Sequence, residues 1–379
     1  MTIVITGYNA ICNVGNNIDD MYQKVINADN SCFEVSENYI KNKKVRVGKI
    51  NAQLPEIQDE EFNLRCNRLV LKVLELLDDK IIKLKNDYSK DKIGIVAATT
   101  NSGIEEFEKS RNTKHYELGN PARFLQKHLG LEGYYTTVST ACSSGIKAFC
   151  IARDLIKNNI SDAVIVVSVD PLSKMPLFGF NSLEVLSDKP SIPFSKNREG
   201  MNIGEGCAIF IIEKDAKEGI EISGLGESSD VYHSTTPDPD AKEAIKAIEQ
   251  ALKEANITPD KIDYINTHGT GTIANDTMEA NAIYKVFGEK VPTSSTKPIT
   301  GHCLGASAGI ETALCCKLLE SSDLKLYPQV FDGEYDESLP KINLVIKNKD
   351  YNKCNICMCN SFGFGGTNAI LILRNKNGQ

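Results

Sequence analysis

Strand-sized apolar runs alternate with longer segments whose apolar residues recur at helical spacing, over almost the whole chain. The runs that we predict as strands are Thr2–Thr6, Ile93–Ala98, Tyr135–Ser139, Ala163–Ser168, Ala208–Glu213, Ile220–Gly224, Ile262–Thr267, Pro292–Thr296, Asn355–Asn360 and Asn368–Leu373. The segments that we predict as helices are Glu60–Leu77, Ser143–Lys157, Ala241–Glu254, Thr277–Phe287 and Leu304–Leu319. Alternation of this kind indicates the α/β class.

The chain also repeats itself on either side of a charged turn, Lys214–Gly219. It opens with TIVITGYNAI and restarts after the turn with GIEISGLGES. In the first part the strand TTVST leads into ACSSG and a helix, and in the second PTSST leads into KPITGHCLGASAG and a helix. We therefore expect two repeated halves, 1–215 and 216–379. The repeat places Cys142 and His302 at related strand-to-helix junctions, which could face one pocket.

Composition fits a globular chain and narrows the function classes. Of 379 residues, 41% are apolar and 25% are charged, which excludes a mainly disordered protein. The net charge of −7 argues against a broad nucleic-acid surface. No run approaches the ~20 apolar residues that span a bilayer, and the N-terminus lacks the basic start of a secretory signal. We expect a cytoplasmic protein.

The 12 cysteines are better explained as reduced thiols than as a disulfide framework. Cys354, Cys357 and Cys359 lie close together, but no second Cys or His pair at ligand spacing accompanies them. Their alternation with apolar residues predicts a strand, so we expect no metal site.

Cys142 is the leading candidate for a nucleophile. It lies in VSTACSSG, directly before a predicted helix, where unpaired N–H groups and the positive end of the helix dipole favour a thiolate. The small residues on both sides allow close approach of a substrate. The alternative is a buried structural thiol, which is the interpretation we favour for Cys150, Cys207, Cys315 and Cys316.

Two of the five histidines lie in comparable settings at glycine-rich strand ends. His268 begins HGTGT after a predicted strand, and His302 lies in TKPITGHCLG. A lone histidine is usually a packed or capping side chain. Two such histidines together with Cys142 make a more specific set, which indicates a catalytic site.

Four motifs in order, ACSSG, NTHGTGT, SSTKPITGH and NSFGFGGTN, make the chain resemble the elongating β-ketoacyl-acyl-carrier-protein synthases of the thiolase superfamily. The block PFSKNREGMNIGEGCAIFIIEK extends the resemblance, which covers essentially the whole chain. It implies a five-layered αβαβα fold built from two repeated halves. Initiating synthases use His and Asn beside the Cys, and thiolases use His and a second Cys, so His268 and His302 indicate the elongating branch.

The resemblance implies a decarboxylative Claisen condensation in fatty-acid or polyketide-like chain elongation. Cys142 would carry the acyl chain as a thioester, and His268 and His302 would stabilise the enolate formed as malonyl-carrier protein loses carbon dioxide. The backbone N–H groups of Cys142 and Phe364 would hold the oxyanion. Both substrates would be carried on the phosphopantetheine of acyl carrier protein, with no metal or redox cofactor.

Supporting residues carry over one at a time. Lys297 matches the lysine near the histidines, and Glu311 matches its carboxylate partner. Thr270 and Thr272 match residues that contact the pantetheine arm, and Phe362 and Phe364 match the loop that gates the acyl pocket. Asp276 and Glu279 also match, although a helix cap and a first-turn acid explain them almost as well.

The segment between Ile104 and Cys142 spans only 38 positions, which is shorter than in typical fatty-acid enzymes of this branch. It contains the helix-like core ARFLQKHLG. This compact form resembles synthases of specialised pathways, such as those of aryl-polyene lipids.

Two points about partners follow from the resemblance. The enzyme would be a homodimer, or a heterodimer with a related subunit, and a non-catalytic chain-length-factor-like subunit is the alternative function. Carrier proteins are acidic, so docking needs a local basic patch. Arg65, Arg68 and Lys72 recur at helical spacing and are candidates, although a solvated helix face explains them equally well.

Overall fold

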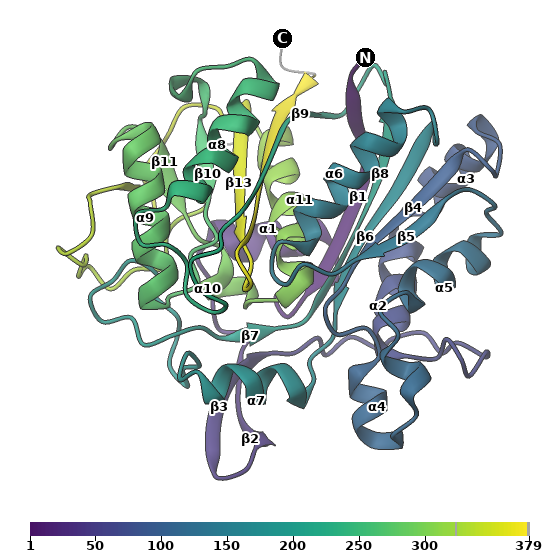
Figure 1. Ribbon diagram of the computed structural model, residues 1–379, viewed down its shortest axis with the longest axis horizontal. Helices are drawn as coiled ribbons and strands as arrows, with labels where there is room; N and C mark the ends of the chain where they lie inside the picture. The colour runs from purple at the N-terminus through teal and green to yellow at the C-terminus, as the bar shows by residue number, and fades with distance from the viewer. Residues whose placement is uncertain (323, 377–379) are drawn as a thin grey trace.

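A computed structural model describes residues 1–322 and 324–376 of the chain (Figure 1). Its main sheet has 11 strands in the order β12-β11-β10-β13-β14-β9-β1-β8-β6-β4-β5. The strands before the charged turn are β1 (Ile3–Cys12), β4 (Ile93–Ala98), β5 (Tyr135–Val138), β6 (Ala163–Asp170) and β8 (Gly206–Lys214). Those after it are β9 (Ile220–Ser229), β10 (Tyr264–Asn266), β11 (Pro292–Ser294), β12 (Asn343–Leu344), β13 (Ile356–Phe362) and β14 (Thr367–Asn375).

The two sets of strands follow the same path. Reading outward from the place where β1 pairs with β9, the order is β1-β8-β6-β4-β5 on one side and β9-β14-β13-β10-β11 on the other. In each set the first three strands are antiparallel neighbours, and the last three are parallel neighbours. Matching β5 with β11 also makes their following helices equivalent, as the sequence repeat predicts.

The helices and the two halves of the sheet form five layers, with helices between the halves and on both outer faces. The helices α6 (Ser144–Lys157) and α11 (Ser307–Glu320) lie in the centre, packed against strands from both halves (Figure 1). Outside the first half lie α2 (Arg65–Leu74), α3 (Asp78–Asp87) and α5 (Asn120–Leu129), and outside the second lie α8 (Lys242–Ala255) and α9 (Ile273–Phe287). Each interface between layers holds its own apolar cluster, since the central strands, such as β4 and β6, are buried on both faces. The predicted αβαβα arrangement is confirmed.

Helix ends differ from the prediction in three places. The expected helix Glu60–Leu77 begins only at Arg65, because Leu64 is extended, and its last turn is the 3₁₀ segment η1 (Glu75–Leu77). The helix expected to start at Leu304 opens with the 3₁₀ turn η4 (Leu304–Ala306). Helix α9 starts four residues earlier than expected, at Ile273. The helix-like core ARFLQKHLG lies in α5.

Several short elements escaped prediction. They are the helix α3, the strand β12, α1 (Ile18–Ile26), α4 (Ile104–Ser110), η2 (Thr113–Tyr116), α7 (Lys174–Ser182), η3 (Pro259–Lys261), α10 (Lys297–Thr300) and the small sheet of β2 (Glu34–Ile40), β3 (Lys43–Gly48) and β7 (Ile203–Gly204). All twelve cysteines are free thiols, as predicted. Within the described residues, no helix combines the length and the apolar character needed to cross a membrane.

Candidate active site

Cys142 lies between β5 and α6, as the sequence predicts. The turn that presents it is held by side chains of the helix start: the Ser144 hydroxyl accepts from Thr140 N–H at 2.8 Å and donates to the Ala141 carbonyl at 2.6 Å. Ala141 adopts a left-handed backbone with φ of 53°, a conformation that turns the chain sharply into the helix. Cys142 is therefore fixed in place, with its side chain buried.

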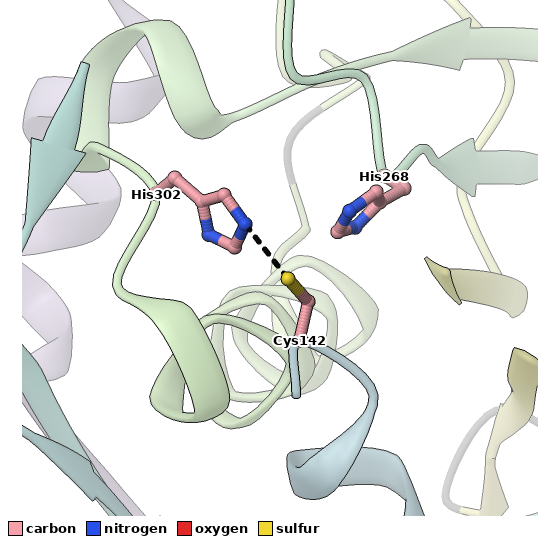
Figure 2. Close-up of side chains that lie close together, drawn as sticks. All are labelled: Cys142, His268 and His302. Carbon is pink, nitrogen blue, oxygen red and sulfur yellow. Dashed lines mark hydrogen bonds between the residues drawn. The ribbon is translucent and has the colours of Figure 1, made fainter. Parts of the chain in front are cut away.

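His302 points its ring at the Cys142 sulfur. Its Nε2 atom lies 3.1 Å from Cys142 Sγ, although the two residues are far apart in the sequence (Figure 2). Gly301 precedes it with φ of 75°, and a Cβ there would lie 2.9 Å from Gly204 Cα, so only glycine lets the chain pass. The N–H of Leu304 donates to His302 Nδ1 at 3.2 Å. In a neutral ring this assigns the proton to Nε2, the atom that faces the sulfur.

His268 approaches from the other side, at the end of β10. Figure 2 shows both imidazoles converging on Cys142, with ring centroids of His268 and His302 5.5 Å apart and planes at 90°. One ring nitrogen of each histidine and Cys142 Sγ all lie within 4.8 Å of one another. The structure thus brings together the three residues that the sequence singles out.

Glu279 and Asp276 hold the loop that carries His268. The Glu279 carboxylate accepts the N–H groups of His268 at 2.8 Å and Gly269 at 2.7 Å, and Asn360 donates to it at 3.1 Å. Asp276 accepts from Gly271 N–H at 3.2 Å and from Phe194 N–H at 3.0 Å. Both carboxylates are fully buried. Asp276 lies in the first turn of α9, as the alternative of a first-turn acid expects, and it also binds the loop before the helix.

Lys297 and Glu311 form a buried ion pair behind the three residues, 2.5 Å apart between Nζ and Oε1. Burial lowers the pKa of both His268 and His302 well below the usual range, and the charge of Lys297 lowers them further. Both rings are therefore neutral at pH 7.

The thiol of Cys142 departs from expectation. Burial raises its pKa to about 11, although the charge of Lys297 and hydrogen bonds from the backbone N–H groups of Phe364 and Cys142 lower it. The stabilisation predicted from the helix start is present, but desolvation outweighs it. The resting group is therefore the thiol.

A cavity of about 370 Å³ opens onto the three residues. Thr270, Thr272, Phe362 and Phe364 line it, together with Phe180 and Met201. The Phe364 ring lies against Phe180, with centroids 5.5 Å apart, and is 38% exposed at the mouth. The cavity therefore has an aromatic closure and hydroxyl groups along one wall, which suit a slender thioester arm.

The three proposed docking cations lie on α2 but are already paired. Arg65 binds the buried carboxylate of Glu205 at 2.5 Å, Arg68 binds Glu56 at 2.7 Å and Lys72 binds Glu75 at 3.1 Å. None of them lines the cavity at Cys142. Carrier docking at Arg68 and Lys72 stays a prediction, and Arg65 has a structural partner that the sequence did not reveal.

Sequence reasoning also missed residues that complete the site. The Ser307 hydroxyl lies 2.8 Å from His302 Nδ1, the Ser361 hydroxyl donates to the Cys142 carbonyl at 2.9 Å, and Phe180 contacts Phe364. These two serines and the phenylalanine lie on separate elements and form no sequence motif, so only the folded structure shows that they belong to the site.

Comparison with known families agrees with this geometry. The family model "Beta-ketoacyl synthase, N-terminal domain" matches residues 1–218, and "Beta-ketoacyl synthase, C-terminal domain" matches residues 220–326. The chain belongs to the beta-ketoacyl synthase family. It is thus a condensing acyltransferase, and the resemblance seen in the motifs is confirmed.

Individual relatives support the same assignment. A 3-oxoacyl-[acyl-carrier-protein] synthase 2 from Staphylococcus aureus is 28% identical over 98% of both chains. The enzyme of the same name from Coxiella burnetii is 35% identical over 64% of this chain and 62% of its own length. Among solved structures, a chain of the complex of the ketosynthase ApeO with its chain length factor ApeC, from Xenorhabdus doucetiae, has a TM-score of 0.93 and 36% identity, over 99% of this chain and 98% of that chain. The thiolase-like fold is thereby confirmed as well.

Proposed function

We propose that this synthase performs its condensation with Cys142 as acyl carrier and with His268 and His302 as hydrogen-bond donors to the malonyl thioester. The observation that carries the proposal is the neutral His302 ring with its Nε2 proton directed at the reacting sulfur, 3.1 Å away. The buried ion pair of Lys297 and Glu311 is the nearby charge that acts on these three residues.

The first half-reaction loads the acyl chain. The Cys142 sulfur attacks the acyl thioester of the carrier's phosphopantetheine, a C–S bond forms as the old one breaks, and the thiol proton passes to the departing pantetheine sulfur. The backbone N–H groups of Cys142 and Phe364 already point at this sulfur, so the carbonyl oxygen of the acyl group can accept from them. Because the resting thiol is protonated, its deprotonation belongs to this step.

The second half-reaction forms the carbon–carbon bond. The malonyl thioester carbonyl accepts hydrogen bonds from His268 and His302, its carboxylate leaves as carbon dioxide, and the electron pair remains as an enolate. The enolate carbon attacks the acyl carbonyl, and the Cys142 sulfur leaves and regains a proton. Neutral imidazoles suit this role, because they donate a hydrogen bond without protonating the enolate outright.

The substrates that fit this site are acyl and malonyl groups on the phosphopantetheine of an acyl carrier protein, with the arm along Thr270 and Thr272. None of these steps requires a metal or a redox cofactor. The 36% identity to a chain of a ketosynthase–chain length factor complex supports a heterodimer and a specialised, polyketide-like chain, with a homodimer as the alternative. The presence of Cys142 supports a catalytic subunit over a chain-length-factor-like one.

We also propose that the chain divides into halves at 215/216, and that it acts in the cytoplasm.

The test separates the two half-reactions. Cys142→Ala should abolish acyl loading and condensation but still release carbon dioxide from malonyl-carrier protein, since decarboxylation needs only the polarised carbonyl. His268→Ala and His302→Ala should each slow decarboxylation by about 10²–10³-fold, as removal of an oxyanion donor does. His302→Ala should still load an acyl group, as mass spectrometry of the intact enzyme would show.

The matched control is Cys150→Ala, which removes another buried thiol from α6, outside the cavity. It should keep both half-reactions. Condensation by Cys142→Ala would overturn the assignment of the nucleophile, and normal decarboxylation by both histidine variants would overturn their roles.

A further inference from the structure

Asp170, the last residue of β6, is a fully buried carboxylate surrounded by donors from two different loops. Its Oδ1 accepts from the Thr99 hydroxyl at 2.7 Å, from Thr100 N–H at 2.8 Å and from Asn101 N–H at 2.7 Å. Its Oδ2 accepts from the Thr100 hydroxyl at 2.8 Å and from Gly305 N–H at 2.7 Å. Among the described residues no Lys, Arg or His forms an ion pair with it. Burial raises the pKa of this carboxyl, although the hydrogen bonds from Thr99, Asn101 and Thr100 lower it.

Gly305 belongs to the loop that positions His302. The N–H of Leu304 donates to His302 Nδ1, and the next N–H along the chain, that of Gly305, donates to Asp170. Between them Leu304 adopts a left-handed backbone with φ of 54°, which is unfavourable for a leucine and persists only where the surroundings hold it. The Asp170 carboxylate binds the loop directly after Leu304, at Gly305, and so helps to hold Leu304 in this conformation.

Gly305 packs closely against both Asp170 and Thr100. A Cβ on Gly305 would lie 2.8 Å from Asp170 Oδ2 and 3.0 Å from Thr100 Cγ2, so the backbone reaches the carboxylate only because the side chain is absent. A small displacement of Asp170 would therefore move the Leu304–Gly305 backbone, and with it the N–H group that faces His302 Nδ1.

We propose that Asp170 is a positioning residue for His302. By holding Gly305 N–H, it keeps Leu304 N–H on Nδ1 and thereby keeps the ring proton on Nε2, where the malonyl carbonyl needs it. The inference rests on the proposed function, since it assigns Asp170 an effect only on the half-reaction that uses His302. Acyl loading depends instead on the backbone N–H groups of Cys142 and Phe364, which Asp170 does not touch.

The decisive variant is Asp170→Asn, which keeps the size but replaces one acceptor oxygen with an NH₂ group. Thr100 N–H and Asn101 N–H lie 2.8 and 2.7 Å from Oδ1, whereas Oδ2 has one close backbone donor, Gly305 N–H, and a longer contact of 3.1 Å with Thr100 N–H. The amide oxygen should therefore turn toward Thr99–Asn101, so that the NH₂ group opposes Gly305 N–H. Decarboxylation of malonyl-carrier protein should fall by about 10²-fold, the size of effect expected when a catalytic group is displaced by about 1 Å. The rate of acyl loading should change by less than about threefold, because loading does not use the Nε2 proton. The KM for malonyl-carrier protein should change less than kcat, because the hydrogen bond from Nε2 strengthens as negative charge develops on the enolate oxygen.

A double-mutant cycle with His302→Ala shows whether Asp170 acts through that ring. If it does, Asp170→Asn added to His302→Ala lowers decarboxylation no further, because the positioned group is already gone. Multiplied losses in the double variant, or an equal loss of acyl loading in Asp170→Asn, would overturn the proposal in favour of a merely structural role. If His302→Ala alone decarboxylates normally, the proposed function fails instead, so the two failures are distinguishable.

Two further variants keep the test sound. Asp263→Asn is the matched control, since Asp263 also accepts two backbone N–H groups, of Asn355 and Ile356, but lies outside the cavity; it should leave decarboxylation unchanged. If Asp170→Asn does not fold, Gly305→Ala disturbs the same contact from the loop side and enters the same cycle. A normal decarboxylation rate in a folded Gly305→Ala enzyme would overturn the proposal.

Discussion

Lys297 Nζ and Glu311 Oε1 lie 2.5 Å apart with their side chains 2% and 1% exposed, which makes them a fully desolvated ion pair next to the catalytic cavity. Burial raises the pKa of Glu311 to about 7, and the charge and hydrogen bond of Lys297 oppose that rise. Glu311 therefore depends on Lys297 to remain charged inside the protein.

Removing one member of this pair should cost more than removing both. We expect Lys297→Met to lower the free energy of unfolding by about 3–5 kcal/mol, because Glu311 is left without a partner. Lys297→Met combined with Glu311→Leu should recover most of that loss while both variants remain impaired in decarboxylation. Urea unfolding monitored by circular dichroism measures this, and a double variant as unstable as the single one would contradict it.

The pKa of Cys142 leads to an unusual pH dependence of its alkylation. Because burial raises the pKa of this thiol to about 11, the rate of reaction with iodoacetamide should rise about tenfold per pH unit through pH 9, without a plateau. Glutathione in the same tube, a free thiol with a pKa near 8.5, should level off first. The rate is read from the mass of the Cys142 peptide, and a plateau below pH 9 would contradict the prediction.

How much the sequence reveals depends on whether the cause is local. The positions of Cys142, His268 and His302 could be predicted, because each follows a strand and lies in a short motif of small residues that is visible in the sequence itself. The high pKa of Cys142 could not, since desolvation comes from residues of the whole cavity wall. Nor could the left-handed backbone of Leu304, which depends on Asp170 from a distant strand.

Arg65 illustrates the same limit on the surface. Its spacing with Arg68 and Lys72 predicts one exposed helix face, but its guanidinium turns inward to Glu205, which comes from a different part of the chain and is itself fully buried. Amphipathic spacing gives the face of a helix, whereas the direction of a long side chain depends on what lies beneath it.

Charge changes at Arg65 and Arg68 should therefore have different effects. Arg65→Ala should destabilise the protein by about 3–5 kcal/mol, because the Glu205 carboxylate is left buried without its partner. Arg68→Ala should cost less, about 1–2 kcal/mol, because its partner Glu56 is well exposed and the main loss is its hydrogen bonds to the Pro55 and Leu54 carbonyls. Thermal unfolding of both variants compares the two.

Charge reversal at Arg68 tests carrier docking. If α2 docks the acidic carrier, Arg68→Glu should raise the apparent KM for acyl-carrier protein at low salt, and the increase should shrink at high salt. Acyl loading from a free pantetheine thioester should stay unchanged. An apparent KM that does not respond to Arg68→Glu at low salt would remove this helix from the docking surface.

Phe364 should protect the acyl-enzyme from water. Its ring lies on Phe180 at the mouth of the cavity, and its 38% exposure means that the fold does not depend on it. Phe364→Ala retains the backbone N–H that faces Cys142, so loading should persist, but the opened cavity admits water to the thioester. We expect the acyl group on Cys142 to hydrolyse about tenfold faster, a loss of about 1.4 kcal/mol of barrier.

Phe331→Ala is the matched control, because Phe331 is 37% exposed but lies outside the cavity. Intact-protein mass spectrometry of the loaded enzymes over time measures both rates, and equal half-lives of the Phe364→Ala and Phe331→Ala acyl-enzymes would show that the ring does not exclude water.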